Sequence, residues 1–177
     1  MEVISESLKN HNTCLKKLDV SDCRLDDRDL EFLCDALCSK SVALEDLLID
    51  RNSLSNRGIE YMANCLSEMK SLRNLNMWGN WFDEESLMIF ARALERNYIL
   101  LEVFTLLYQE SNDSEELIKY YTMLNKAGRR LIEYEDTPLG LWPLVLERAQ
   151  KIEIDSKRIR AHDLIYSLLR IPALLNR

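Results

Sequence analysis

The chain has 177 residues, of which 47% are hydrophobic and 30% charged, a globular composition that suits one domain or a short array of repeats. No apolar run reaches the roughly 18 residues needed to span a bilayer, so no membrane partner is expected. The net charge of −7 is uneven, with −9 in residues 1–114, which argues against nucleic acid because phosphate binding depends on Lys and Arg. The acidity favours a protein partner with a basic surface, and an acidic surface that serves solubility explains it equally well.

The five cysteines are odd in number and irregularly spaced, and residues 1–12 lack the apolar stretch of a signal peptide. Reduced thiols in the cytoplasm are therefore expected, with the nucleus as an alternative compartment.

A pattern of leucines recurs four times along the chain. Its form is L-x-x-L-x-L-x-x-(N/C)-x-L, and its copies begin at Leu15, Leu44, Leu72 and Leu101, which are 29, 28 and 29 residues apart. Apolar residues at the first, fourth and sixth positions predict a short strand whose alternate side chains enter a core.

A second pattern follows each predicted strand. Offsets 15, 18, 19 and 22 from the starting leucine are apolar in the first three units: Leu30, Leu33, Cys34 and Leu37; Ile59, Met62, Ala63 and Leu66; Leu87, Phe90, Ala91 and Leu94. This spacing predicts a helix with one buried face, and Asp26 or Asp27, Ser55 and Asp83 are the expected N-caps. Each unit is thus a strand followed by a helix, and stability comes from stacking units on one another.

The ninth position of the pattern holds Cys23, Asn52 and Asn80, where the chain leaves each strand. We expect the two asparagine amides to satisfy backbone groups that no strand pairing reaches, and the Cys23 thiol to do so more weakly.

The repeat phase also extends backwards, because Ile4 and Leu8 fall at core offsets of a unit that would start before Leu15. We therefore expect the chain to begin inside the helix of an incomplete unit. The strand at 16–20 should have no neighbour on its N-terminal side, an open edge that a longer array or another element would cover.

Beyond the fourth unit the apolar pattern loses its repeat phase. Helices are predicted over about 114–134, from near Pro143, and from near His162 to a point before Pro172. Their apolar faces should pack against the exposed end of the array. The predicted organisation is a repeat array over 1–112 and an all-helical C-terminal cap over 113–177.

The alternating 28- and 29-residue period, with Cys or Asn at the ninth position, resembles the ribonuclease-inhibitor-like subfamily of leucine-rich repeats over roughly residues 1–110. The resemblance implies an α/β fold, namely a right-handed horseshoe solenoid with a parallel concave sheet and outer helices. It also implies protein–protein recognition, since the subfamily includes enzyme inhibitors, GTPase-activating proteins, actin regulators and innate immune receptors. Residues 124–143 are similar to C-terminal extensions of leucine-rich-repeat proteins of microalgae, which implies no function.

Signs of catalysis are weak in this sequence. The only histidines, His11 and His162, precede a strand and begin a helix, where surface or capping roles suit them better than catalysis, so no enzyme activity and no cofactor are expected. Cys34 and Cys38 could begin a zinc site, but Cys34 occupies a core offset. The run Asp22, Asp26, Asp27 and Asp29 lacks the glycine and glutamate of a calcium-binding EF-hand loop, so no metal is expected.

The third, fifth, seventh and eighth positions of each unit should face the concave side. From these we select as partner-binding residues Asp19, Asp46, Leu48, Asp50, Arg51, Asn76, Trp78, Leu107 and Tyr108. The aspartates form an acidic stripe, and Trp78 and Tyr108 an aromatic anchor. Packing beneath the C-terminal helices is an equal alternative for Leu107 and Tyr108. Val103 and Thr105 are also placed on the concave face, and Trp81 is assigned to packing within a loop.

The function predicted is therefore a non-catalytic protein–protein interaction module of adaptor, inhibitor or sensor type. Two alternatives stay open: a regulator of a small GTPase of the activating kind, and the C-terminal part of a longer leucine-rich-repeat receptor.

Overall fold

The computed structural model describes residues 1–177 except 12–13, 40–41, 106–111, 133–140, 153–158 and 171–177. The strands are β1 (Lys17–Asp19), β2 (Asp46–Leu48), β3 (Asn74–Asn76) and β4 (Glu102–Phe104). The α-helices are α1 (Glu2–His11), α2 (Asp27–Leu37), α3 (Asn56–Cys65), α4 (Glu84–Ala93), α5 (Asp113–Ala127), α6 (Leu141–Lys151) and α7 (Ala161–Leu169). Two short 3-10 helices are η1 (Leu94–Arg96) and η2 (Arg129–Ile132).

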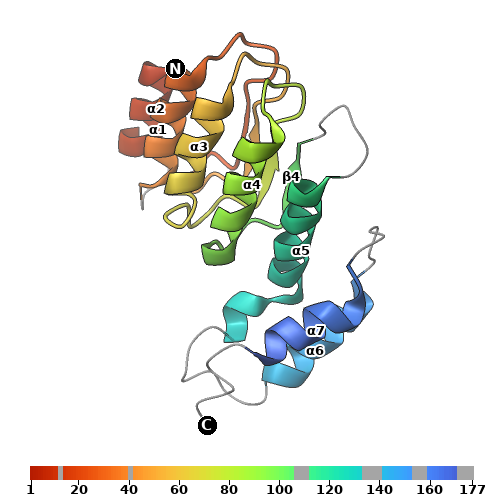
Figure 1. Cartoon of the computed structure of the whole chain (residues 1–177). Coiled ribbons are helices and arrows are strands. Elements are labelled where there is room, and N and C mark those ends of the chain that lie inside the picture. Colours follow the sequence, from red (N-terminus) through yellow and green to blue (C-terminus); the bar gives the residue numbers. More distant parts are fainter. Residues whose placement is uncertain (12–13, 40–41, 106–111, 133–140, 153–158, 171–177) are drawn as a thin grey trace.

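The four strands form one parallel sheet in the order β1-β2-β3-β4, with one strand from each repeat. Helices α1 to α5 stand side by side in a second layer, each in contact with the next (Figure 1). This is the α/β leucine-rich-repeat solenoid that the sequence predicts. Among the described strands β1 lies at the N-terminal edge of the sheet, as expected.

The core lies between the two layers. All twelve residues at the predicted helix offsets are buried, and so are the pattern leucines of the second and third units, such as Leu47 and Leu75. The matching residues Leu15 and Leu18 of the first unit are only partly buried, because β1 has a neighbour on one side only. Stacking, rather than any single unit, encloses the core.

The ninth-position asparagines bind backbone as predicted. Asn52 Oδ1 accepts hydrogen bonds from the N–H groups of Cys23 and Leu25, both at 3.0 Å, and its amide nitrogen donates to the carbonyls of Val20 and Ile49. Asn80 joins the second and third units in the same way. The Cys23 thiol donates to the carbonyl of Ser21 at 3.3 Å.

A further set of hydrogen bonds joins successive repeats at the starts of their helices. Asp27 accepts hydrogen bonds from both the backbone N–H (2.7 Å) and the hydroxyl (2.6 Å) of Ser55. Ser55 therefore lies at the N-cap of α3 without capping it, since its hydroxyl serves Asp27 instead. Gly58 allows this approach, because a Cβ there would lie 2.5 Å from Asp27 Oδ1.

The same arrangement continues along the array. Asn56 accepts from the N–H of Asp83 at 3.0 Å and donates to the Asp83 carboxylate. Glu84 accepts from the N–H (2.9 Å) and the hydroxyl (3.2 Å) of Ser114. Asp27, Asn56 and Glu84 each follow the N-cap residue of their own helix, so the acceptor always lies at the same place in the repeat.

The fourth unit begins one residue earlier than the sequence pattern suggested. In the sheet, Val103 pairs with Leu75, which places Leu100 rather than Leu101 at the first pattern position. Leu100 is fully buried and Leu101 only partly so. Asn97 helps to position this segment, because its side chain accepts from the N–H groups of Ile99 and Leu100.

The two ends of the chain differ from expectation in detail. Leu8 is buried as predicted, but Ile4 is 42% exposed and Ser5 faces the core instead. The helix expected over 114–134 ends at Ala127, because Gly128 adopts a left-handed conformation (φ 95°) that turns the chain into η2.

Helices α6 and α7 do not cover the end of the sheet. They pack on each other and on α5 around a second cluster that includes Trp142, Val145 and Leu164. Figure 1 shows them beyond the C-terminal end of α5, below the array. Helix α5 thus contributes to both cores, with Ile118 in the first and Leu124 in the second.

Candidate binding surface on the concave face of the sheet

The outward positions of the strands line a groove on the face of the sheet opposite the helices. A part of about 260 Å³ lies over Lys17, Asp46, Leu48 and Asn74. A second part of about 380 Å³ lies at the β4 end of the sheet, where α5 also contributes to the lining; it is lined by Trp78, Val103, Phe104, Ile118 and Lys119. Asn76 and Phe104 line both parts, so the two adjoin, and we call them together the concave groove.

Four of the predicted residues therefore line the concave groove, namely Asp46, Leu48, Asn76 and Trp78. Trp78 is 36% exposed and Leu48 is half-buried. The Asp46 carboxylate accepts a hydrogen bond from the side-chain amide of Asn74 on the neighbouring strand. Apolar and carboxylate groups are thus interleaved on this face.

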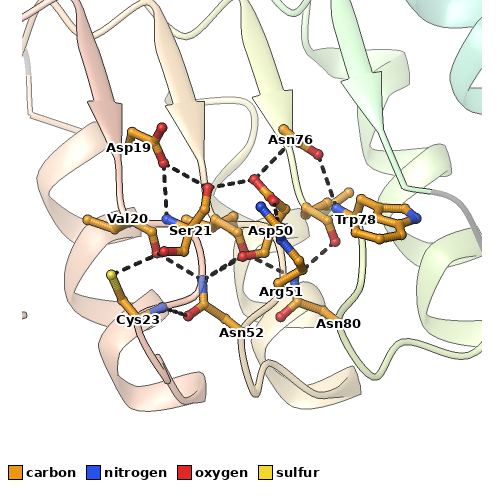
Figure 2. Close-up of polar contacts among 12 residues, drawn as sticks. Asp19, Val20, Ser21, Cys23, Asp50, Arg51, Asn52, Asn76, Trp78 and Asn80 are labelled. Atoms are coloured by element: carbon orange, nitrogen blue, oxygen red, sulfur yellow. Dashed lines mark hydrogen bonds and ion pairs between the residues drawn. The ribbon is translucent and has the colours of Figure 1, made fainter.

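A polar network occupies the edge where the strands end, as Figure 2 shows. The Ser21 hydroxyl lies 2.7 Å from Asp19 Oδ1 and 2.6 Å from Asp50 Oδ1, so its single proton is shared by two carboxylates. Asp50 also accepts from the amide of Asn76 (3.0 Å) and from Arg51 Nε (3.2 Å). With 6% of its surface exposed, Asp50 is a buried acid joining three repeats, not the open contact residue expected from the sequence.

Asp19 differs from Asp50 because its side chain is exposed. The hydroxyl and then the backbone N–H of Ser21 donate to its carboxylate, and these bonds hold the pKa of Asp19 below its ordinary value of 3.8. Asp19 is therefore an anion at neutral pH and is available to a partner.

Arg51 and Trp78 form the junction between the polar network and the apolar part of the groove. The Arg51 guanidinium lies 6.0 Å from the centre of the Trp78 ring, within range of a cation–π contact. Arg51 has a positive φ of 53°, and Gly79 leaves space beside it. The Arg51 charge is thus held over the indole by the polar edge of the groove.

The shifted fourth unit changes which residues face the groove. Val103 is half-buried and Thr105 is buried, so their predicted exposure was wrong. A shift of one residue turns each side chain of a strand to the opposite face. Phe104 takes the outward position instead and is 56% exposed. The sequence pattern missed it because Leu100 and Leu101, like Val103 and Phe104, are neighbouring apolar pairs that fit either alignment.

Three other predictions concern aromatic and aliphatic residues near this face. Leu107 and Tyr108 lie outside the described residues. Trp81 is 77% exposed and is not packed within its loop, contrary to the sequence interpretation. It follows Asn80 at the edge of the array and does not line the concave groove.

The described side chains show no arrangement suited to covalent chemistry. Burial raises the pKa of the Cys34 thiol well above its ordinary value and that of Cys38 to about 12, so both stay protonated and are poor nucleophiles. His162 is exposed in the first turn of α7 beside Asp163. Within the described ranges, no three His, Cys, Asp or Glu residues are placed to hold a metal ion.

Comparison with known proteins identifies the repeat. The Leucine Rich Repeat family matches residues 14–36, which contain β1 and most of α2. These residues are therefore a leucine-rich repeat, and the four-stranded parallel sheet with its outer helices has the leucine-rich-repeat fold. The ribonuclease-inhibitor-like subfamily remains a prediction from the period of the repeats.

Similar leucine-rich-repeat proteins occur among long multidomain chains. The protein is 27% identical over 111 residues to NACHT, LRR and PYD domains-containing protein 4C of Mus musculus, an alignment that covers 62% of this chain and 11% of that one. It is 31% identical over 93 residues to NACHT, LRR and PYD domains-containing protein 13 of Homo sapiens, covering 52% and 9%. The chain thus spans about a tenth of the length of these relatives.

Two solved structures share the fold of this chain. One is the Leiomodin-1 Actin-Binding Site 2, with a TM-score of 0.63 and 20% identity over 73% of each chain. The other is the tropomodulin C-terminal domain of Caenorhabditis elegans, with a TM-score of 0.53 and 17% identity over 73% of this chain and 95% of that one. At these identities the likeness concerns the fold. No helix in the described part of the chain combines the length and apolar character needed to cross a membrane.

Proposed function

We propose that this leucine-rich-repeat protein binds another protein in its concave groove, without catalysing a reaction. The observation that carries the proposal is the pair of exposed aromatic side chains, Trp78 and Phe104, that line one pocket of about 380 Å³ on the concave sheet. Exposed aromatic residues beside a pocket suit an apolar side chain of a partner, and such contacts supply much of the binding energy of interfaces. Repeat arrays generally use such concave surfaces for binding.

The chemistry around the pocket favours a partner with basic side chains next to an apolar one. Asp19 and Asp46 supply carboxylates on the first two strands, and Glu115 borders the aromatic pocket. The buried Asp50 carboxylate orients Arg51 and Asn76 at this surface by accepting a hydrogen bond from each. Carboxylates beside a binding surface affect the rate of association and the choice of partner more than the final affinity.

The remaining parts of the proposal concern organisation and compartment. Residues 1–112 form the binding array and residues 113–177 the C-terminal cap, whose first helix also contributes Ile118 and Lys119 to the pocket. Five cysteine thiols that are free rather than paired support a reducing compartment, the cytoplasm or the nucleus.

The proposal is tested by partner capture with matched tryptophan variants. Proteins captured from a lysate by the wild-type chain are identified by mass spectrometry and compared with those captured by Trp78→Ala and Trp81→Ala. Both variants remove an exposed indole, but only Trp78 lines the concave groove. The specific partner should bind Trp78→Ala roughly 30-fold more weakly or worse, as for an interface hot spot of about 2 kcal/mol, and bind Trp81→Ala almost normally.

A second variant addresses the electrostatic part of the proposal. Asp19→Lys should slow association of the same partner at low salt, and the difference should shrink as salt screens the charge. If the partner binds Trp78→Ala as well as it binds the wild type, the concave-face proposal is wrong.

A further inference from the structure

A second groove lies outside the concave face, along the edge of the sheet where the strands begin. It encloses about 960 Å³ and is lined by residues from all four repeats, including Lys16, Glu45, Arg73 and Leu101 just before the strands. At its far end it reaches α5, η2 and α6. We call it the edge groove.

The edge groove is basic in an acidic protein. Among the described residues, its walls carry six basic side chains and two acidic ones, Glu45 and Glu68, although the chain has a net charge of −7. The basic residues are Lys16, Lys70, Arg73, Lys126, Arg130 and Arg148. Such a local reversal of charge marks a surface that attracts anionic groups.

Part of this basic charge has no ion-pair partner among the residues that the structure describes. Glu45 is already shared by Lys16 at 2.7 Å and Arg73 at 3.5 Å. In contrast, Arg130 and Arg148 are exposed and form no ion pair with any residue of the described ranges. They lie together at the end of the groove formed by the C-terminal helices.

The shape and lining of the edge groove suit a peptide better than an isolated phosphate. The basic groups are spread along the groove, and Val42, Ile99 and Leu131 lie among them. Cationic and apolar side chains within one groove match a chain that carries both acidic and apolar side chains.

We propose that the edge groove binds an extended acidic segment of a partner protein, with Arg130 and Arg148 as the main anchors for its carboxylates. This surface is separate from the concave groove, so the inference does not depend on the function proposed above. Several exposed ion pairs, each weak in water, act together with apolar contacts, and the binding should therefore weaken as salt concentration rises.

The test selects peptides from a displayed library of random sequences on the full-length protein. The enriched peptides should combine Asp or Glu with apolar residues. Their affinity for the double variant Arg130→Glu/Arg148→Glu, measured by fluorescence anisotropy, should fall about tenfold or more. The matched control Arg92→Glu/Arg96→Glu changes the charge equally at two exposed arginines outside the groove and should alter affinity less than about twofold.

Two further variants separate this surface from the concave groove and from misfolding. Trp78→Ala should leave the selected peptides bound. Lys70→Gln, in the part of the edge groove formed by the repeats, should weaken them by a smaller factor, and circular dichroism checks that each variant folds.

The proposal is overturned if no acidic peptide is enriched, or if the two double variants bind alike. It is also overturned if phosphatidylserine vesicles bind through Arg130 and Arg148 while acidic peptides do not. Dimerisation of the wild type that Arg130→Glu/Arg148→Glu abolishes, without any peptide binding, would point to a second copy of the chain instead.

Discussion

Asn52 shows how one side chain can join two repeats. Its amide contacts backbone groups of both the first and the second unit, and it is almost completely buried. An asparagine can do this because it offers two donors and an acceptor within one planar group. The sequence predicted this role, since the position recurs with the period of the repeat and follows each strand directly.

Replacing Asn52 by alanine should therefore be costly. The variant leaves the N–H groups of Cys23 and Leu25 and the carbonyls of Val20 and Ile49 without these partners in a buried place, and we expect a loss of about 3 kcal/mol in the free energy of unfolding. Urea unfolding measures it. Asn64→Ala is the control, because Asn64 is exposed on α3 and alanine favours a helix. Equal losses in the two variants would contradict the role of the amide.

Asp83 gives the molecule a predictable response to acid. Its carboxylate caps α4 by accepting the N–H of Ser86 at 2.8 Å, and this bond, with help from Asn56, holds the pKa of Asp83 below 3.8. A carboxyl whose pKa is lower in the folded state stabilises the fold above its unfolded pKa, and the contribution disappears as pH falls through the folded pKa.

The variant Asp83→Asn keeps a capping side chain but removes the titration. The wild type should have the higher melting temperature above about pH 5, and the difference should shrink below about pH 4. Thermal unfolding followed across this range provides the measurement. A difference that stays constant with pH would show that charge at Asp83 is not the cause.

The exposure of strand residues was predictable where the leucine pattern allowed one alignment of a unit, and was not predictable where it allowed two. In the first three units one apolar residue fits each signature position, and the strands lie in the predicted register, although Asp50 is buried. The fourth unit offers Leu100 and Leu101, and the pattern alone could not decide between them. The hydrogen bonds of Asn97, a residue outside the signature, helped to decide the register, and with it the exposure of Phe104.

At the scale of elements, the joint after α5 connects the array to the C-terminal helices. Gly128 ends α5, and the next residue, Arg129, turns back to donate to the carbonyls of Leu94 and Asn97 at 2.7 and 2.6 Å. Its guanidinium also lies 4.5 Å from the ring centre of Tyr98. A buried cation thus satisfies carbonyls at the end of η1, where the helix dipole is negative.

Neighbouring arginines make this joint testable. Arg129→Ala should lower the free energy of unfolding by about 2–4 kcal/mol, because buried carbonyls and aromatic faces lose their cation. Arg130→Ala should change it by less than about 0.5 kcal/mol, because Arg130 is exposed. Chemical unfolding of both variants compares them directly, and similar values would mean that the joint does not depend on Arg129.

The helices themselves were predictable to different degrees. Within the array, four apolar offsets repeated three times fix the buried face of each helix. The C-terminal helices were predicted to exist because local apolar spacing and proline positions suffice for that. The prediction that they pack against the end of the array was wrong. An apolar pattern that occurs once shows which face of a helix is buried but not which element covers it, and the turn at Gly128 directs these helices away from the sheet.

At the scale of the whole molecule, the protein has two hydrophobic cores that share α5. The first fills the solenoid and the second lies among α5, α6 and α7. In a repeat protein each unit contacts mainly its neighbours, so stability is local and opening can start at one end. The second core should therefore open while the array remains folded.

Hydrogen exchange can resolve the two cores with one variant in each. Val145→Ala, in α6, should increase exchange in α6 and α7 and leave β2 and β3 protected. Leu75→Ala, in the centre of the array, should increase exchange in the strands, with a loss of about 2–4 kcal/mol. If Val145→Ala exposes β2 and β3 to the same extent, the molecule unfolds as one unit and this description fails.

The bonds at the helix starts restrict how such a gene could gain or lose repeats. Asp27 faces two donors on Ser55, whereas Asn56 faces both a donor and a carboxylate on Asp83. A recombination that removed the second repeat would set Asp27 against Asp83, and two carboxylates would repel at a helix junction. Removal of the third would set Asn56 against Ser114, whose donors suit the amide oxygen. Although the units share one pattern, they are therefore not interchangeable, because the contacts at the helix starts depend on the order of the repeats.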